Sequence, residues 1–362
     1  MLGFVAIGLT IMMVFTLVKN ALKGKQLSAE DVFSGTVELL IPVTTHSNFH
    51  FAPWREALSD FKTMSGRLKI HILIDGHNPK IDQWNNLKSL FPFIEIQCFL
   101  MRPQDIDPAS WMIDQMVSKV RSDVIIIGDP EIAASEVAFV STAKIVSEKN
   151  EPYFILPQTA KLNPVNEAIA ALNPTLSLTS VFGFRKFRKA ISHPLMSLAQ
   201  GWMAMPLNIF QEIKLQGPGF PSWKQSMSRQ WDTLNKSYHL AFGEKHLKRF
   251  YETDLKLQFE SLTKDWEFYW KECDRTGFWL YLVTIILWSF PIIFFYFNPF
   301  ASILSAVLLI LYRFFTKIVF QESWSALFLH FVGCLALLGS FGIWAFLGLK
   351  SKYKSQGLGS VS

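Results

Sequence analysis

The first residues that could do chemistry lie in DVIIIGDPEIAAS, residues 123–135, where two acids follow a run of branched apolar residues. Asp129 and Glu131 stand one residue apart, directly after Gly128. If a turn bends both carboxylates to one side, they could hold a divalent cation, because Mg²⁺ and Mn²⁺ prefer oxygen ligands. The same residues suit an ordinary helix start, since Asp is a favoured N-cap, Pro130 fits the first helical position and Glu suits the positive helix end. The sequence leaves both interpretations open.

The elements that must position these acids are strands that alternate with helices over residues 36–180. Apolar runs predict strands, and amphipathic spacing predicts helices between them. The strands are expected at 36–43, 67–75, 93–100, 123–128 and 153–158. The helices are expected at 52–64, 81–90, 108–122 and from the end of the fourth strand through residue 148. This alternation predicts an α/β fold with a mostly parallel sheet that is covered on both faces.

Ligands of such sheets bind outside the carboxyl ends of the strands. The predicted strands therefore place three segments at one edge: Pro42–Thr45, Asp75–Asn78 and Gly128–Glu131. The fold class predicts only the place of a site, and the chemistry of the site depends on the side chains there.

The composition indicates membrane segments, because half of the 362 residues are hydrophobic and the mean hydropathy is +0.23. Residues 2–18 carry no charge and are long enough to span a bilayer. A cleaved signal peptide would have cations before its apolar core, whereas Lys19, Lys23 and Lys25 follow it here. We therefore predict a retained anchor over residues 1–20, with the following domain in the cytoplasm.

Residues 277–350 predict a C-terminal membrane region of a multi-pass protein in the cell membrane. Its apolar runs are 278–297, 301–320 and 326–349, and the middle run contains Arg313 and Lys317. Three spans would place the lysines at 350, 352 and 354 outside, against the positive-inside tendency, whereas two spans with an interfacial 301–320 would return them inside. The number of spans stays open.

Between the domain and these runs, residues 181–275 predict a helical, membrane-interfacial region. Residues 182–189 interleave phenylalanine with arginine and lysine, and 191–210 are apolar but broken by Gly and Pro. The segment could lie among lipid headgroups, or form a basic surface helix followed by a core helix. Nucleic acid is not an expected partner, because the basic patch is short and flanked by membrane-like sequence.

Other chemistry-bearing residues give weaker patterns. The three cysteines, Cys98, Cys273 and Cys334, show no zinc or disulfide spacing. His46 and His50 are read as polar loop residues and His71 as a buried or cross-strand histidine. The chain contains no phosphate-loop, dinucleotide-binding or serine-nucleophile motif.

Four stretches occur in a fixed order between the two apolar ends of the chain: VELLIPVTTH (37–46), ILIDGHN (72–78), DVIIIGDPEI (123–132) and HPLMSLAQGWMAMPLNIFQEI (193–213). This order resembles that of membrane-bound family 2 glycosyltransferases, in the branch of the ceramide glucosyltransferases and carotenoid glycosyltransferases. In that family the first stretch leads into a nucleotide-contacting loop, the second is normally Asp-Asp-Gly-Ser and the third ends at the metal site. In the fourth, a Gln-Gly pair precedes an apolar strand on the acceptor side.

The resemblance implies a GT-A type fold, a nucleotide-sugar donor, a lipid-like acceptor and, in an active enzyme, Mg²⁺ or Mn²⁺. Asp129 would then contact the ribose and the metal, Glu131 would ligate the metal, and Asp75 would contact the nucleoside. The full set implied for the donor is Pro42, Thr44, Asp75, Gly76, Asp129, Arg229 and Trp231. The chain departs from the family where Ile74 replaces the first Asp of the second stretch and where Glu131 replaces a shorter acid.

An inverting transfer also needs a general base for the acceptor hydroxyl. Gln225 and Ser226 occupy the positions at which the resemblance would place acids, so Glu212 and Asp232 are the nearest substitutes. Arg229 could pair with the diphosphate. We therefore carry two hypotheses: a membrane glycosyltransferase with a lipid-like acceptor, or a catalytically impaired relative that acts as a membrane-bound binding or assembly partner.

Overall fold

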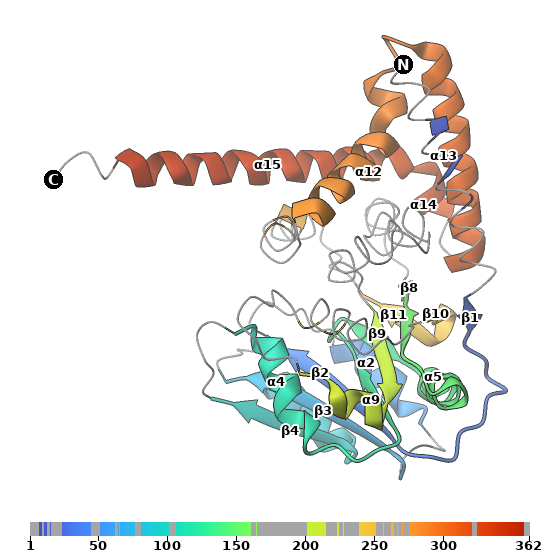
Figure 1. Ribbon diagram of the computed structural model, residues 1–362, viewed down its shortest axis with the longest axis vertical. Helices are drawn as coiled ribbons and strands as arrows, with labels where there is room; N and C mark the ends of the chain where they lie inside the picture. Colours follow the sequence, from blue (N-terminus) through green and yellow to red (C-terminus); the bar gives the residue numbers. More distant parts are fainter. Residues whose placement is uncertain are drawn as a thin grey trace. The chain divides into compact units, whose positions relative to one another are not determined.

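The computed structural model describes residues 24–44, 51–61, 66–76, 81–100, 106–160, 201–214, 239–250, 275–320 and 324–357, with isolated residues elsewhere. The chain divides into two compact units, which are described one at a time (Figure 1). An α/β unit comprises Asn20–Ala160 and Arg185–Phe250. A helical unit comprises Met1–Lys19, Lys161–Phe184 and Tyr251–Ser362.

The main sheet of the α/β unit has, in the residues described, eight strands in the order β1-β10-β7-β9-β5-β2-β3-β4. Every neighbouring pair is parallel except those of β9, which runs antiparallel to both β5 and β7. The predicted mostly parallel α/β sheet is confirmed. The strands are β1 Lys25–Gln26, β2 Val37–Val43, β3 Leu68–Asp75, β4 Ile94–Phe99, β5 Val124–Ile127, β7 Tyr153–Leu156, β9 Trp202–Pro206 and β10 His239–Phe242.

A second, three-stranded sheet lies within the same unit. Its order is β6-β11-β8, and β11 pairs antiparallel with β6 and parallel with β8. The strands are β6 Ile132–Ala134, β8 Gln158–Thr159 and β11 Leu247–Arg249, with a 3₁₀ turn, η1, at Glu244–His246 before β11. This small sheet joins the segment after β5 to residues more than a hundred positions later in the chain.

Helices cover both faces of the main sheet, as the alternating pattern predicts. On one face, α2 Phe51–Ser59, α3 Ile81–Leu90 and α5 Glu136–Lys149 bury residues in one core cluster with the strands. Trp54 and Leu58 of α2 and Trp84 and Leu87 of α3 are three or four residues apart, which places each pair on one helix face. The other face is covered by α4 Pro108–Val117, which contacts β2 and β3, and by α9 Leu207–Glu212, which contacts β5 and β9.

Local capping explains where α4 starts and where α5 ends. The Asp107 carboxylate accepts hydrogen bonds of 2.7 Å from both the backbone N–H and the hydroxyl of Ser110, and Pro108 occupies the first turn. Asn150 ends α5 in the left-handed region at φ 51°, and its N–H donates to Val146 O.

The prediction that a helix starts directly after residue 128 is wrong. The chain forms a turn and then β6, and α5 begins only at Glu136. Asp129 and Glu131 are therefore not the cap of a helix. The segment forms a strand instead of a helix because its backbone pairs with β11. No local sequence pattern predicts this pairing.

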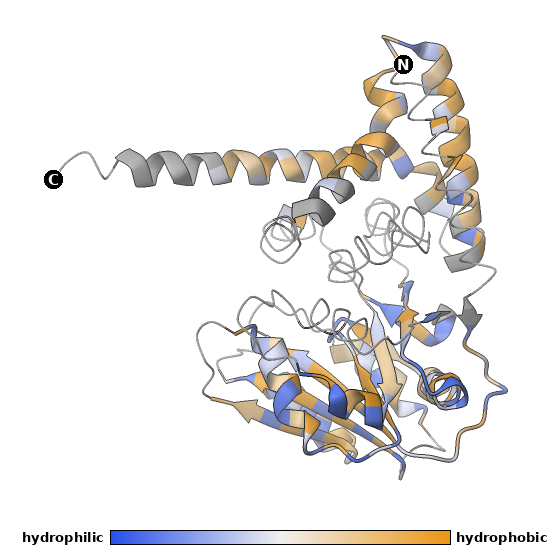
Figure 2. Cartoon of the chain, in the orientation of Figure 1, coloured by the Kyte–Doolittle hydropathy of each residue, from blue (hydrophilic) through white to orange (hydrophobic). Residues whose placement is uncertain are grey.

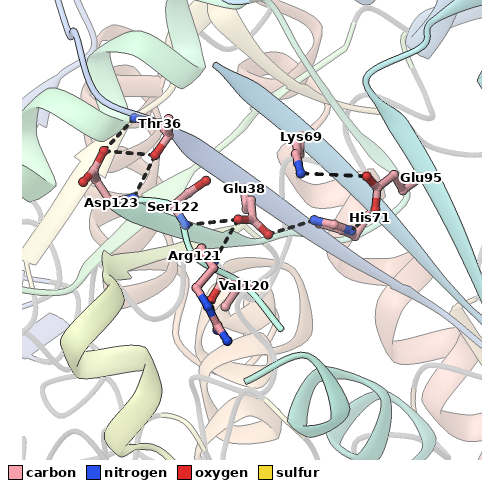
Figure 3. Close-up of polar contacts among 9 residues, drawn as sticks. All are labelled: Thr36, Glu38, Lys69, His71, Glu95, Val120, Arg121, Ser122 and Asp123. Atoms are coloured by element: carbon pink, nitrogen blue, oxygen red, sulfur yellow. Dashed lines mark hydrogen bonds and ion pairs between the residues drawn. The ribbon is translucent and has the colours of Figure 1, made fainter. Parts of the chain in front are cut away.

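A buried polar cluster near the amino ends of β2 and β3 contains the predicted buried histidine (Figure 3). His71 Nε2 lies 2.8 Å from Glu38 Oε2, and the backbone N–H groups of Arg121 and Ser122 donate to Glu38 Oε1 at 3.0 and 3.1 Å. His71 Nδ1 lies 3.4 Å from Glu95 Oε2 without hydrogen-bond geometry. Burial alone would raise the pKa of Glu38, but the hydrogen bonds from His71, Arg121 and Ser122 outweigh it and lower the pKa to about 2.

The helical unit is apolar along most of its length (Figure 2). Its helices are α12 Arg275–Ile293, α13 Pro299–Phe320, α14 Trp324–Phe328 and α15 His330–Gly357. Within the described residues, one helical segment, His330–Gly348 with a hydropathy of 2.0, has the length and composition to cross a membrane. The predicted N-terminal anchor lies outside the described residues except for positions 7, 8, 11, 12 and 15. Membrane spans at either end stay a prediction.

Candidate functional site

The carboxyl ends of the central parallel strands bring together the segments that the sequence placed at one edge. Leu40 pairs with Ile127, and the N–H of Gly128 donates to Leu40 O at 3.0 Å, so β5 ends beside β2. Val43 pairs with Ile74, so β2 and β3 end together. Three neighbouring strands therefore end close to Thr44, Asp75 and Asp129.

The strand order reverses at this point of the edge. Successive strands β2, β3 and β4 extend the sheet in one direction, and β5 then returns to the other side of β2. Such a reversal is a topological switch point, where connections leave in opposite directions and open a crevice for ligands. Thr44 follows β2 and Asp129 follows β5, so both lie at the switch point.

Three hydrogen bonds fix the turn that carries the two acids. The N–H of Ile132 donates to Asp129 O at 3.1 Å within the turn itself. The indole Nε1 of Trp54, on α2, donates to Pro130 O at 2.9 Å. The N–H of Phe250, after β11, donates to Glu131 O at 3.0 Å. The turn is therefore positioned by the core helix and by the small sheet, as a preorganised site requires.

Glu131 has a side-chain partner that the sequence did not indicate. Arg249, on β11, donates from Nη2 at 2.7 Å and from Nε at 3.2 Å to Glu131 Oε2. The side chain of Arg249 is 8% exposed and that of Glu131 is 20% exposed, so the pair is largely shielded from water. Charge-assisted bonds of this kind are strong and directional.

This ion pair bears directly on the predicted metal site of Asp129 and Glu131. Among the described residues no group of three or more His, Cys, Asp or Glu side chains could hold a metal ion. A divalent cation at Glu131 would have to share this carboxylate with the guanidinium of Arg249, which already neutralises its charge. This pairing makes the described donor set a poor fit for a divalent cation, and the ligand role of Glu131 stays a prediction.

Gly128 allows the closest packing at the switch point. A Cβ at this position would lie 2.7 Å from Trp202 Nε1 and 2.8 Å from Trp202 Cδ1, so only glycine lets the indole approach the chain just before Asp129. Trp202, the first residue of β9, is fully buried, and its Nε1 has no hydrogen-bond partner in the described structure. It is a buried donor beside the predicted ligand edge.

The other residues predicted for the donor fall into two groups. Pro42 is buried within β2, and Asp75 ends β3, half-buried. The N–H of Gly76 donates to Phe99 O at 2.9 Å, which continues the pairing of β3 with β4. Arg229 and Trp231 lie outside the described residues, as do His46 and His50.

Neither predicted general base is placed at this edge in the residues that the structure describes. Glu212 is exposed at the end of α9, which follows β9. Because β9 is antiparallel to β5, Pro206 pairs with Val124, and α9 begins at the opposite edge of the sheet from Asp129. Asp232, the other predicted base, lies outside the described residues.

Sequence reasoning missed Arg249, Trp202 and Trp54 as residues of this site. Arg249 lies 118 residues after Glu131 in a short basic stretch with no motif, and only the pairing of β11 with β6 brings the two together. A weak signal existed for Trp202, because it directly follows the Gln-Gly pair of the fourth family-like stretch.

Comparisons with known proteins give a likeness in structure and none in sequence. No family model matches the chain, and no curated protein matches it. A mannosyltransferase, PcManGT from Pyrobaculum calidifontis, solved with GDP-Man and Mn²⁺, aligns at a TM-score of 0.45 and 9% identity, covering 93% of this chain and 99% of that one. Residues 1–349 of TarS from S. aureus align at a TM-score of 0.41 and 8% identity, covering 64% of this chain and 65% of that one. At these values the likeness does not identify an activity, which must be argued from the sheet and its edge.

Proposed function

We propose that the chain is a membrane glycosyltransferase that moves a sugar from a nucleotide-sugar donor to a lipid-like acceptor. The observation that carries the proposal is the position of Asp129 and Thr44 at the switch point between β2 and β5, with Asp75 at the end of the adjoining strand. Nucleotides bind at this place in open α/β sheets. The order of the four family-like stretches agrees with this position.

In this proposal each residue of the edge has a separate task. Asp75 accepts hydrogen bonds from the nucleoside, Asp129 accepts from the ribose, and Pro42 and Gly76 shape the strand ends that receive the nucleotide. Arg229 pairs with the diphosphate and Trp231 packs against the donor. In the transfer, an acceptor oxygen attacks the anomeric carbon, the bond to the diphosphate breaks with its electron pair, and the acceptor proton passes to a base.

The acceptor side and the cellular location belong to the same proposal. The apolar helices of the helical unit would hold the chain in the cell membrane as a multi-pass protein, with the α/β unit in the cytoplasm. A lipid-like acceptor would then reach the site from the bilayer along residues 182–213. Arg185, Lys186, Arg188 and Lys189 would contact anionic lipid headgroups.

Donor binding tests the proposed site directly. We expect the full chain to bind UDP-glucose or GDP-mannose in calorimetry, and Asp75→Asn and Asp129→Asn each to weaken that binding about tenfold or more, because a lost charge-assisted hydrogen bond is worth about that factor. Asp60→Asn is the matched control, because Asp60 is exposed after α2 and away from the edge. Equal loss in the control, or no binding of either donor, would contradict the site.

The rival hypothesis is a relative without catalysis, and one observation favours it: Glu212, one of the two predicted bases, lies at the opposite edge of the sheet from Asp129. A transfer assay separates the two hypotheses. The active enzyme should move labelled sugar from the bound donor into a membrane lipid extract, or hydrolyse the donor slowly. Intact donor binding without transfer or hydrolysis would identify a binding or assembly partner instead.

A further inference from the structure

The starting observation is that Arg249 pairs with one oxygen of the carboxylate that was predicted to ligate a metal. Two N–H donors of its guanidinium meet one oxygen, Glu131 Oε2, at 2.7 and 3.2 Å. The Arg249 side chain is 8% exposed, so little water is available to replace this partner. Removing one member of such a shielded pair leaves the other charge uncompensated, which is unfavourable.

The backbone fixes both members of the pair. Arg249 pairs with Ile132 in the antiparallel ladder of β11 and β6, so its position relative to Glu131 is set by strand register. The N–H of Phe250 donates to Glu131 O at 3.0 Å, and the N–H of Ala160 donates to Arg249 O at 2.8 Å. The guanidinium is therefore held beside the Asp129–Glu131 turn by main-chain contacts as well as by its own ion pair.

A divalent cation at this place would meet two obstacles. The cation would compete with Arg249 for the negative charge of Glu131, and the shielded guanidinium would lie next to a doubly charged cation. Like charges at short range in a poorly solvated site repel strongly. The turn would then give the cation few protein ligands, and water and the diphosphate would have to supply the other oxygens of its octahedral shell.

We propose that this edge binds a nucleotide diphosphate without a divalent cation, with Arg249 as the positive group of the site and Glu131 as the residue that positions it. A guanidinium suits this task, because its planar set of N–H donors matches phosphate oxygens and its charge is permanent. Because Glu131 is paired, its charge does not repel the diphosphate. The inference rests on the proposed function and changes the role of Glu131 from ligand to positioning residue.

The decisive experiment compares donor binding by the full chain in EDTA and in Mn²⁺. UDP-glucose and GDP-mannose are titrated calorimetrically under both conditions. We expect the affinity of the donor that binds to agree within about twofold, since a metal-bridged diphosphate would lose far more. Binding only in Mn²⁺, or about tenfold tighter in Mn²⁺, would overturn the inference and leave the proposed function standing. No binding under either condition would instead remove the proposed function, and the inference with it.

Variants of Arg249 test whether its positive charge binds the donor. In EDTA, Arg249→Gln is expected to weaken donor affinity about tenfold or more, and Arg249→Lys to restore part of it because the charge returns. Lys248→Gln is the matched control, because Lys248 is the neighbouring residue of β11 and is exposed on the other side of that strand. A loss in Lys248→Gln as large as in Arg249→Gln would show that general positive charge, not this guanidinium, binds the donor.

Glu131→Gln separates positioning from ligation. If Glu131 positions Arg249, the variant should bind the donor more weakly by the same factor in EDTA and in Mn²⁺, and its melting temperature should fall. If Glu131 ligates a metal, the variant should lose only an advantage that the unaltered chain shows in Mn²⁺, and that outcome would contradict the inference. Should Arg249→Gln fail to fold, the comparison of EDTA with Mn²⁺ on the unaltered chain still decides.

Discussion

The role of an acidic residue depends on which side chain its carboxylate contacts. Asp129 and Glu131 suit a metal, a helix cap or an ion pair equally well by type and spacing. The structure removes the helix cap, because β6 follows the turn, and it gives Glu131 an arginine partner from β11. Glu38 is the converse case. The sequence assigned it no role, yet it accepts three hydrogen bonds, from His71, Arg121 and Ser122.

Glu38→Gln should destabilise the protein in a pH-dependent way. The folded state lowers the Glu38 pKa from 4.5 to about 2, and each pKa unit corresponds to about 1.4 kcal/mol, so the loss at pH 7 is about 3 kcal/mol. Since the folded pKa is the lower one, this stability is present above the unfolded value and disappears as the pH falls toward about 2. Unfolding free energies of both chains from pH 7 down to pH 2 measure it.

The control for this prediction is Glu56→Gln, because Glu56 is exposed on α2. It should change stability little at any pH. A gap between Glu38→Gln and the unaltered chain that stays constant from pH 7 to pH 2 would show that the carboxylate charge contributes nothing.

At the scale of elements, the long apolar strands followed from the sequence and the short ones did not. Strands β2, β3, β4, β5 and β7 lie within two residues of the predicted bounds, because continuous apolar runs have few alternatives to a covered sheet. By contrast β6, β8 and β11 contain only two or three residues each. Their formation depends on long-range pairing, so no period in the sequence marks them.

Gly201, directly before β9, allows the chain to approach β7 closely. A Cβ there would lie 2.4 Å from the backbone oxygen of Ile155 on β7. A backbone atom of a paired strand cannot rotate away as the end of a flexible side chain can. We expect Gly201→Ala to destabilise the protein by about 1–3 kcal/mol, the usual cost of overpacking. Gly66→Ala is the control, because a Cβ at Gly66 meets nothing within 4 Å. A melting temperature unchanged in both variants would contradict the close approach of β9 to β7.

At the scale of the whole molecule, two units of different surface chemistry share one chain. The α/β unit hides its apolar residues in a sheet core, whereas the helical unit exposes them. Its exposed apolar side chains include Ile303, Ile310, Leu311 and Ile318 of α13 and Leu335, Ile343 and Phe346 of α15. Surfaces of this kind need a covering phase or partner, and the proposed bilayer would supply one.

Membrane insertion predicts that the chain resists extraction. After expression, the full chain should stay in the membrane pellet through washes with high salt and with alkaline carbonate, and enter solution only with detergent. The reason is that apolar helices partition into the hydrocarbon and are not released when surface charges are screened or changed. Release by salt alone would indicate attachment through the basic residues 185–189, and release by carbonate would contradict insertion.

The amino-acid sequence alone predicts the class of the sheet, the edge at which Asp75 and Asp129 lie, and the apolar character of the C-terminal helices. These properties are local, because runs and periods of apolar residues set which backbone segments must be covered. The folded structure was needed to find that β9 runs antiparallel, that Trp202 packs on Gly128 and that Arg249 pairs with Glu131. Those contacts join residues 74 to 118 positions apart, and the free energy that selects them comes from pairing and burial, which a local pattern does not encode.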